Sequence, residues 1–166
     1  MRKVATAVGI TPMALYRHYL NRDGLLTALA DAGFDELAER LAGLRLTGSV
    51  ERQLLKILDV FLDLAFESPR LFELMFLTKR EGARQYPEDF RMRHSPTANV
   101  SAEVIARAMQ TGYLKEDDVW EIVFETGALM QGLIMLFVGG RVAMPASEYR
   151  GFCHRSFRRY LNGIRA

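Results

Sequence analysis

The sequence predicts an all-α protein, and three observations carry that prediction. Apolar residues recur at three- and four-residue intervals along nearly the whole chain, as they do on the buried face of a helix. No stretch alternates apolar and polar residues as a half-buried strand does. Capping residues, prolines and glycines mark starts and ends at helix-length intervals. With 166 residues, the chain suits one domain, or one domain with a small module.

Three helices are expected in the N-terminal part. The first ends before Gly9, which can adopt the positive φ that a tight turn needs. Thr11 and Pro12 begin the second, because threonine is a common N-cap and proline suits the first helical position. Asn21 caps the third, which is long. The expected ranges are 2–8, 12–19 and 22–44.

Five more helices are expected in the rest of the chain, which makes eight. Ser49 caps the first of them, and Pro69 begins the second. Asp117 and Asp118 place negative charge at the positive N-terminal end of the fourth, and Gly139 and Gly140 end that helix. The expected ranges are 50–67, 69–78, 96–110 or 97–110, 117–138 and 146–163. The polar segment 79–95 is the longest candidate loop, and a helix within part of it stays an open alternative.

The composition excludes several classes of protein. The chain has 22 Lys and Arg against 20 Asp and Glu, so it is not a polybasic protein, although residues 1–22 contain four basic residues and no acid. One cysteine, Cys153, excludes an intrachain disulfide framework and favours a reducing, cytoplasmic location. No apolar signal segment follows Met1. The most apolar stretch, 126–138, is shorter than the roughly 20 residues that span a bilayer, and predicts a buried core helix.

Residues 2–26 have the physical character of a helix-turn-helix. Ala5 is small where two helices cross, and the helix that begins at Thr11 has free N–H groups that suit a phosphate. Tyr16, Arg17 and His18 project from a helix that fits the major groove. An ordinary corner between two helices with a solvated basic face explains the same spacing.

This segment resembles the DNA-binding signature of the TetR family of bacterial transcriptional regulators. The resemblance rests on the runs RKVA (2–5), VGIT (8–11), LYRHY (15–19), NRD (21–23) and LL (25–26). Residues 68–72 resemble the start of the family's sixth helix, and Gln131 stands where a subgroup has histidine. The resemblance implies DNA contacts from Arg2, Thr11, Pro12, Met13, Ala14, Tyr16, Arg17, His18 and Arg22.

The family has one more helix before this motif. We therefore expect the DNA-binding head to be incomplete, the natural protein to be longer, and Val4, Val8 and Leu15 to lack a packing partner. Alternatively, residues 1–20 are loosely held and DNA binding is weak. The expected organisation is an incomplete helix-turn-helix with its connecting helix over 1–44, followed by a larger helical ligand-binding and dimerisation domain over 45–166.

The resemblance also implies a homodimer that releases DNA when a small molecule enters the larger domain. Gly127 and Gly132 permit close helix approach. The expected dimer interface contains Leu129, Leu133, Leu136, Phe137, Phe152 and Tyr160. The expected ligand pocket contains Phe61, Phe72, Met75, Phe76, Val104, Phe124, Met130, Gln131 and Ile134, although a plain core explains most of these residues equally well.

No catalytic or metal-binding arrangement stands out. The three histidines lack metal-ligand spacing, and Cys153 and His154 are neighbours that point about 100° apart on a helix. We therefore expect no enzyme activity, metal or cofactor. The sequence predicts a cytoplasmic, homodimeric repressor that a small hydrophobic or amphipathic molecule releases from a palindromic DNA operator. The alternative is a dimeric helical small-molecule-binding or interaction module that does not bind DNA because its head is truncated.

Overall fold

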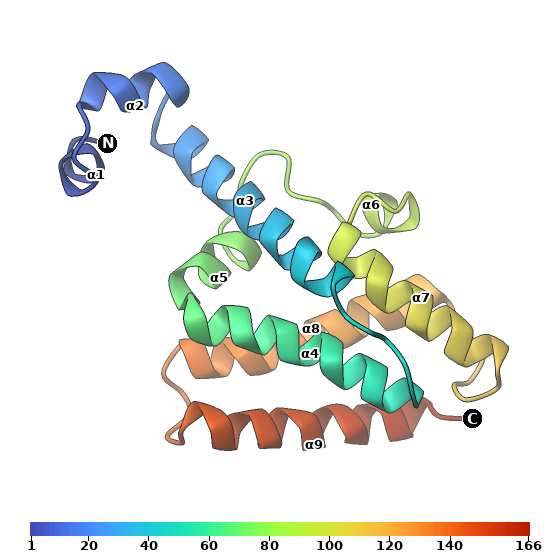
Figure 1. Ribbon diagram of the computed structural model, residues 1–166. Helices are drawn as coiled ribbons and strands as arrows, with labels where there is room; N and C mark the ends of the chain where they lie inside the picture. The colour runs from blue at the N-terminus through green and yellow to red at the C-terminus, as the bar shows by residue number, and fades with distance from the viewer.

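The computed structural model describes residues 1–166, which form nine helices and a single isolated β-bridge. α1 (Arg2–Ala7) and α2 (Pro12–His18) form a small head, joined by a turn at Gly9, whose φ is +72°. The head projects from the N-terminal end of α3 (Arg22–Ala42), away from the body of the molecule (Figure 1). The body contains α4 (Val50–Glu67), α5 (Pro69–Phe76), α6 (Glu88–Arg91), α7 (Pro96–Gln110), α8 (Val119–Val138) and α9 (Ala146–Ile164).

The all-α prediction and the predicted helix starts at Thr11, Asn21, Ser49 and Asp118 are confirmed. Each of these side chains accepts a hydrogen bond from a backbone N–H of the first turn, at 2.8 to 3.3 Å. The sequence left open a helix within the polar segment 79–95 but did not locate it; the structure places α6, of four residues, there. A helix this short buries no residue of its own and so leaves no hydrophobic period to detect.

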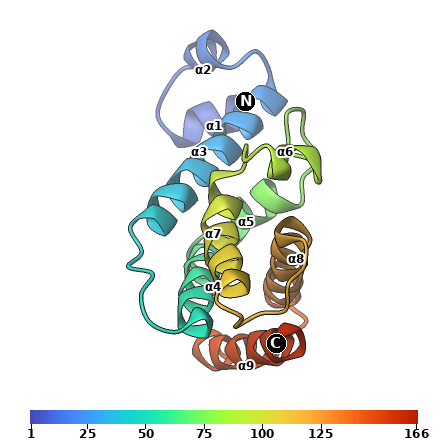
Figure 2. The same cartoon turned by 90° about the vertical axis from the view of Figure 1, so that its right-hand side faces the viewer.

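α4 is the central helix of the body. It packs against α3, α5, α7, α8 and α9, and nine of its residues are buried. α9 lies across the end of the body farthest from the head (Figure 2). This arrangement places the core between α4 and the surrounding helices, and leaves one side of α8 and α9 facing outwards.

The core is apolar and closely packed. The hydroxyl of Tyr149 donates a hydrogen bond to the carbonyl oxygen of Leu133 at 2.7 Å, which pairs the one polar atom of this buried side chain. Burial raises the pKa of Tyr149 to about 12 and that of Cys153 to about 11. The Cys153 thiol is therefore protonated at neutral pH and unsuited to act as a nucleophile.

α3 and α5 cross at Gly33. A Cβ added at Gly33 would lie 2.6 Å from Sδ of Met75 and 3.1 Å from Cδ1 of Leu71. Only glycine fits this crossing without a shift of the neighbouring side chains. The crossing brings α3, which carries the head at its other end, into direct contact with the body.

α8 is longer than the apolar stretch suggested. By length and composition alone it is able to cross a membrane, with 20 residues and a mean hydropathy of 1.6 in its most apolar window. The stretch 126–138 forms the C-terminal part of this helix, which was expected over residues 117–138. A third of that window is buried inside the chain, and the core helix of a soluble protein passes the same test.

The head buries little apolar surface. Only Ala5 and Leu15 are buried in α1 and α2, whereas Val4 is 43% and Val8 61% exposed. Leu15 thus packs within the chain, whereas the two valines are exposed to solvent. We predict that the backbone amides of residues 2–18 exchange with deuterated water much faster than those of α4, because few buried contacts resist local opening.

Hydrogen exchange resolved by mass spectrometry measures this difference, with the amides of α4 as the internal reference. Protection of α2 comparable to that of α4 would contradict the prediction.

Candidate functional site

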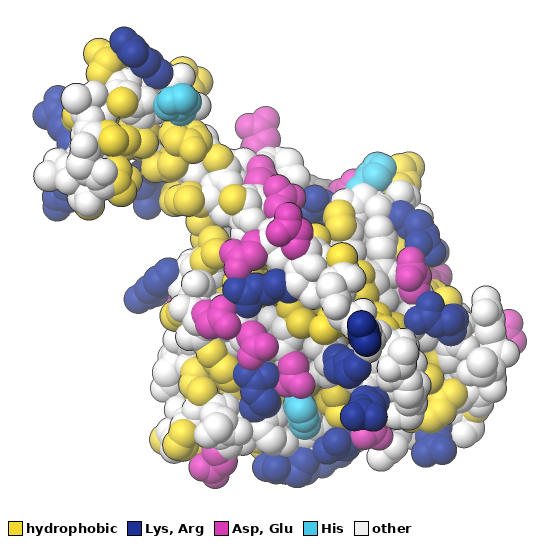
Figure 3. Space-filling view, viewed as in Figure 1, with side chains coloured by type: hydrophobic (Ala, Val, Ile, Leu, Met, Phe, Trp, Pro, Cys, Tyr) yellow, Lys and Arg dark blue, Asp and Glu magenta, His cyan; other side chains and the backbone are white.

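The first candidate site is the exposed surface of the head. The predicted DNA contacts on α2 are all exposed except Ala14, which is half-buried, and Met13 and Tyr16 are 67% and 50% exposed. Arg2 on α1 and Arg22 at the start of α3 are exposed as well. The structure thus places these residues on one small unit, whose visible face in Figure 3 carries Lys, Arg and His side chains and no acidic ones.

Thr11 has a dual capacity at the start of α2. Its hydroxyl oxygen accepts a hydrogen bond from the amide of Ala14 at 3.2 Å, which caps the helix. The hydroxyl proton stays free to donate to an external acceptor, such as a phosphate oxygen. The threonine that starts the helix is therefore also able to contact DNA.

The charge of the molecule is unevenly distributed along its length. Residues 1–22 contain four basic residues and no acidic one. The following part of α3 presents exposed acidic side chains, Asp31, Asp35, Glu36 and Glu39. A polyanion is therefore attracted to the head. On the adjacent part of α3, Asp31 is paired with Arg80 and Glu36 with Arg40.

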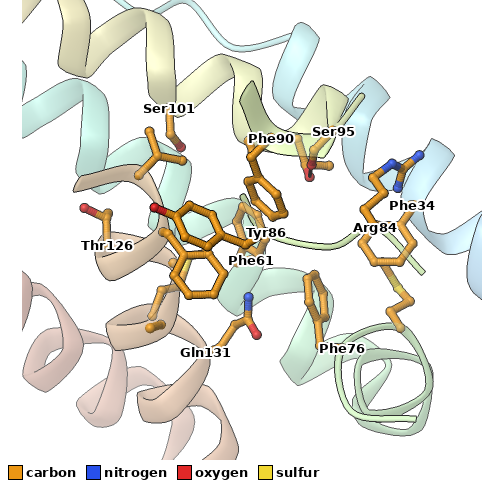
Figure 4. Close-up of a pocket in the computed structure, with 18 of the residues that line it drawn as sticks. Phe34, Phe61, Phe76, Arg84, Tyr86, Phe90, Ser95, Ser101, Thr126 and Gln131 are labelled. Carbon is orange, nitrogen blue, oxygen red and sulfur yellow. Dashed lines mark hydrogen bonds between the residues drawn. The ribbon is translucent and has the colours of Figure 1, made fainter. Parts of the chain in front are cut away.

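The second candidate site is a cavity of about 700 Å³ inside the body. Its wall has 28 residues, 17 of them hydrophobic, and they come from α3, α4, α5, α6, α7, α8 and α9 and the segment between α5 and α7. Aromatic rings dominate it (Figure 4). The ring of Tyr86 stacks on that of Phe124 with centroids 4.3 Å apart, and Phe90 meets Phe124 edge-on at 5.8 Å. The volume suits a small organic molecule.

Six of the predicted pocket residues line this cavity: Phe61, Met75, Phe76, Phe124, Met130 and Gln131. Three do not. Phe72, Val104 and Ile134 are at most 1% exposed and belong to the core, so their assignment to the pocket is corrected. Phe72 contacts the pocket only through its neighbour, because its ring lies 4.5 Å from that of Phe76.

The sequence-based reasoning missed the wall contributed by α3 and by the segment after α5. Phe34, Arg80, Arg84, Tyr86 and Phe90 all line the cavity. Tyr86 and Phe90 gave a usable signal, since two aromatic residues four positions apart in a polar segment favour packing against something apolar.

The outward side of α8 and α9 is the third candidate surface. Leu136 is 49% exposed, and Leu129, Phe152 and Tyr160 are half-buried. A Cβ added at Gly132 would meet no atom within 4 Å, so no element of the same chain packs there. Gly127 lines the cavity and does not belong to this surface.

Two predicted interface residues are engaged inside the chain instead. Leu133 is buried, and the ring of Phe137 lies 4.8 Å from that of Phe66 and stacks on that of Tyr149 at 5.2 Å. Leu133 belongs to the core of the single chain, and Phe137 is partly buried against that core.

Comparison with known proteins points to one family. Residues 54–160 match the family model described as tetracyclin repressor-like, C-terminal domain. No curated protein sequence matches the chain.

Solved structures share the fold over nearly the whole chain. A protein of unknown function from Rhodococcus sp. RHA1 is similar with a TM-score of 0.72 and 21% identity, over 99% of this chain and 84% of that one. A bacterial regulatory protein in the tetR family from Rhodococcus RHA1 is similar with a TM-score of 0.66 and 17% identity, over 93% of this chain and 83% of that one. A proposed TetR-family transcription regulator from Shewanella sp. PV-4 is similar with a TM-score of 0.69 and 18% identity, over 98% of this chain and 85% of that one. Because these sequence identities are low, the similarity shows that the chain shares the fold of these proteins.

Proposed function

The chain belongs to the TetR family of transcriptional regulators, and on that premise we propose that it is a dimeric repressor whose DNA binding responds to a small molecule. Family members sense ligands and regulate transcription, and the chain is accordingly not an enzyme. The single observation that carries the proposal is the pairing of an exposed basic head with a ligand-sized cavity, joined by one continuous helix, α3.

DNA binding would be the task of the head, residues 1–44 with α3 as the connection to the body. α2 is the proposed recognition helix, with Met13 and Arg17 facing base edges and Thr11, His18 and Arg22 near phosphates. A dimer through α8 and α9 would place two such helices at half-sites about 34–36 Å apart, which favours a palindromic operator. These roles suit a cytoplasmic protein.

Ligand response would be the task of the body, residues 45–166. Phe34 of α3 lines the cavity, so a molecule that fills it contacts the same helix that carries the head. Binding that favours one tilt of α3 would change the spacing of the two heads and lower the affinity for the operator.

The test is a DNA-binding measurement on the purified chain. A palindrome selected from a random library is expected to compete over bulk DNA, with an affinity that falls steeply as salt rises. Arg17→Gln is expected to weaken binding about 10- to 100-fold if Arg17 contacts a guanine. Arg70→Gln is the matched control, because Arg70 is an exposed arginine on α5, far from the head in sequence, whose side chain is 90% exposed.

The sparse packing of the head supports one competing function. If the palindrome does not compete and the affinity shows no salt dependence, the repressor proposal fails. Stabilisation of the body by a small molecule without any DNA binding would instead identify a dimeric ligand-binding module.

A further inference from the structure

We infer that the ligand of the cavity is an organic anion with a flat apolar body, and that its acidic group binds Arg84 and competes with Asp31 for Arg80. The inference rests on the proposed function, because it names the ligand class and the regulatory contact of the same cavity.

The charge of the cavity wall is the first argument. Three cationic residues line the cavity, Lys79, Arg80 and Arg84, and no acidic residue does. An organic cation in this cavity would therefore meet like charges, and a neutral molecule would leave the cations without a new partner. An anion gains charge-assisted hydrogen bonds from the same groups.

The two terminal nitrogens of the Arg84 guanidinium make no hydrogen bond within the chain and can donate to a ligand. Its Nε donates to the carbonyl oxygen of His94 at 2.6 Å, and its guanidinium lies 5.5 Å from the centre of the Phe34 ring. Asp89 is the nearby acid, but its carboxylate accepts from the amide of Gln85 at 2.6 Å and contacts Nδ1 of His94 at 3.1 Å. Those two hydrogen bonds, followed by the charges of His94 and Arg84, hold the pKa of Asp89 below its usual value.

Arg80 supplies the second, independent argument. Its side chain is only 10% exposed, and its Nη1 pairs with Asp31 of α3 at 2.8 Å. Its Nε is buried and has no hydrogen-bond partner. A buried donor without an acceptor is costly, and an oxygen anion entering the cavity would remove that cost.

The apolar part of the ligand follows from the rings. Figure 4 shows Arg84 and Phe34 at one end of the site, with Tyr86, Phe61 and Phe90 between that end and Ser101. If the acidic group of a ligand lies at the arginine end, the apolar part of the ligand lies among the rings of Tyr86, Phe61 and Phe90. Flat bodies stack on such faces, which favours an aromatic acid.

The same geometry couples the ligand to α3. Asp31 and Phe34 lie one turn apart on α3, and both contact Arg80, since its guanidinium is 5.3 Å from the Phe34 ring centre. An anion that takes over Arg80 loosens the ion pair between α3 and the segment after α5. Asp31 is 61% exposed, so water can receive its released carboxylate.

The experiment compares two fluorescent dyes with the same ring system. Anilinonaphthalene sulfonate carries an acidic group, and phenyl-naphthylamine lacks it. We expect the sulfonate to bind at least about tenfold more tightly, because charge-assisted hydrogen bonds to arginine carry that much affinity. Arg84→Gln is expected to remove about tenfold of the sulfonate affinity and to leave the neutral dye within about threefold. Asp31→Asn is expected to tighten sulfonate binding, since it removes the competing carboxylate.

Arg70→Gln is the matched control, because Arg70 does not line the cavity. Displacement of the sulfonate dye by naphthoate but not by naphthamide would support the inference with a carboxylate. The inference would be overturned if Arg84→Gln weakened the binding of both dyes equally. It would also be overturned if Arg70→Gln weakened sulfonate binding as much as Arg84→Gln does. If the neutral dye binds as well as the anion, the inference fails while the proposed function stands. If neither dye binds, the ligand-sensing part of the proposed function fails too, and DNA binding decides the rest.

Discussion

Replacing Leu136 by glutamate is expected to convert the proposed dimer into monomers. Leu136 is 49% exposed on the outward side of α8, next to the bare helix surface at Gly132. In a two-fold interface the substitution places two unpaired carboxylates in an apolar contact, at a cost of several kcal/mol. We expect the dissociation constant of the dimer to rise by about 100-fold or more.

Sedimentation velocity over a concentration series measures this change. Leu29→Glu is the matched control, because Leu29 is 47% exposed but lies on α3, away from α8 and α9. It should leave the association state unaltered. If Leu136→Glu sediments as the unmodified chain does at every concentration, the subunits associate through a different surface or not at all.

Phe72→Ala is expected to produce the largest loss of stability among single truncations considered for this chain. The Phe72 side chain is fully buried, with 0% exposure, and its ring contacts that of Phe76 at 4.5 Å. Truncating a buried phenylalanine leaves a cavity and costs about 3–5 kcal/mol. For a chain of 166 residues this corresponds to a fall in Tm of about 10 °C.

Phe124→Ala is the contrasting variant, because Phe124 is 45% exposed and stacks on Tyr86 at the cavity wall. Phe124→Ala should lower Tm much less than Phe72→Ala does, and should weaken dye binding in the cavity more than Phe72→Ala does. Thermal unfolding followed by circular dichroism provides the comparison. Similar Tm values for the two variants would show that Phe72 is not the core residue described above.

The helices were predictable from the sequence because their signals are local. Thr11, Asn21, Ser49 and Asp118 each bond to an amide within the next three residues, so a short window contains the whole cap. The helix-turn-helix of the head was predictable for the same reason, because its motif is one continuous run of residues.

The cavity was only partly predictable because its wall is assembled from distant parts of the chain. Phe72 and Phe76 lie one turn apart on the same helix, and hydrophobic periodicity assigns both to the buried face. Only the packing of the other helices decides that Phe76 borders a cavity and that Phe72 lies in the core. Arg80 and Arg84 had no periodic signal, because they lie in a segment without regular structure.

The close crossing of α3 and α5 at Gly33 makes α3 a lever. Gly33 acts as the fulcrum, since Met75 packs closely against it and also borders the cavity. The arm from Gly33 to Arg22 is roughly 16 Å long, at 1.5 Å per helical residue. A tilt of about 10° at the fulcrum therefore carries the start of α3 sideways by roughly 3 Å. A slight displacement of the cavity wall is thus magnified at the surface that would meet DNA.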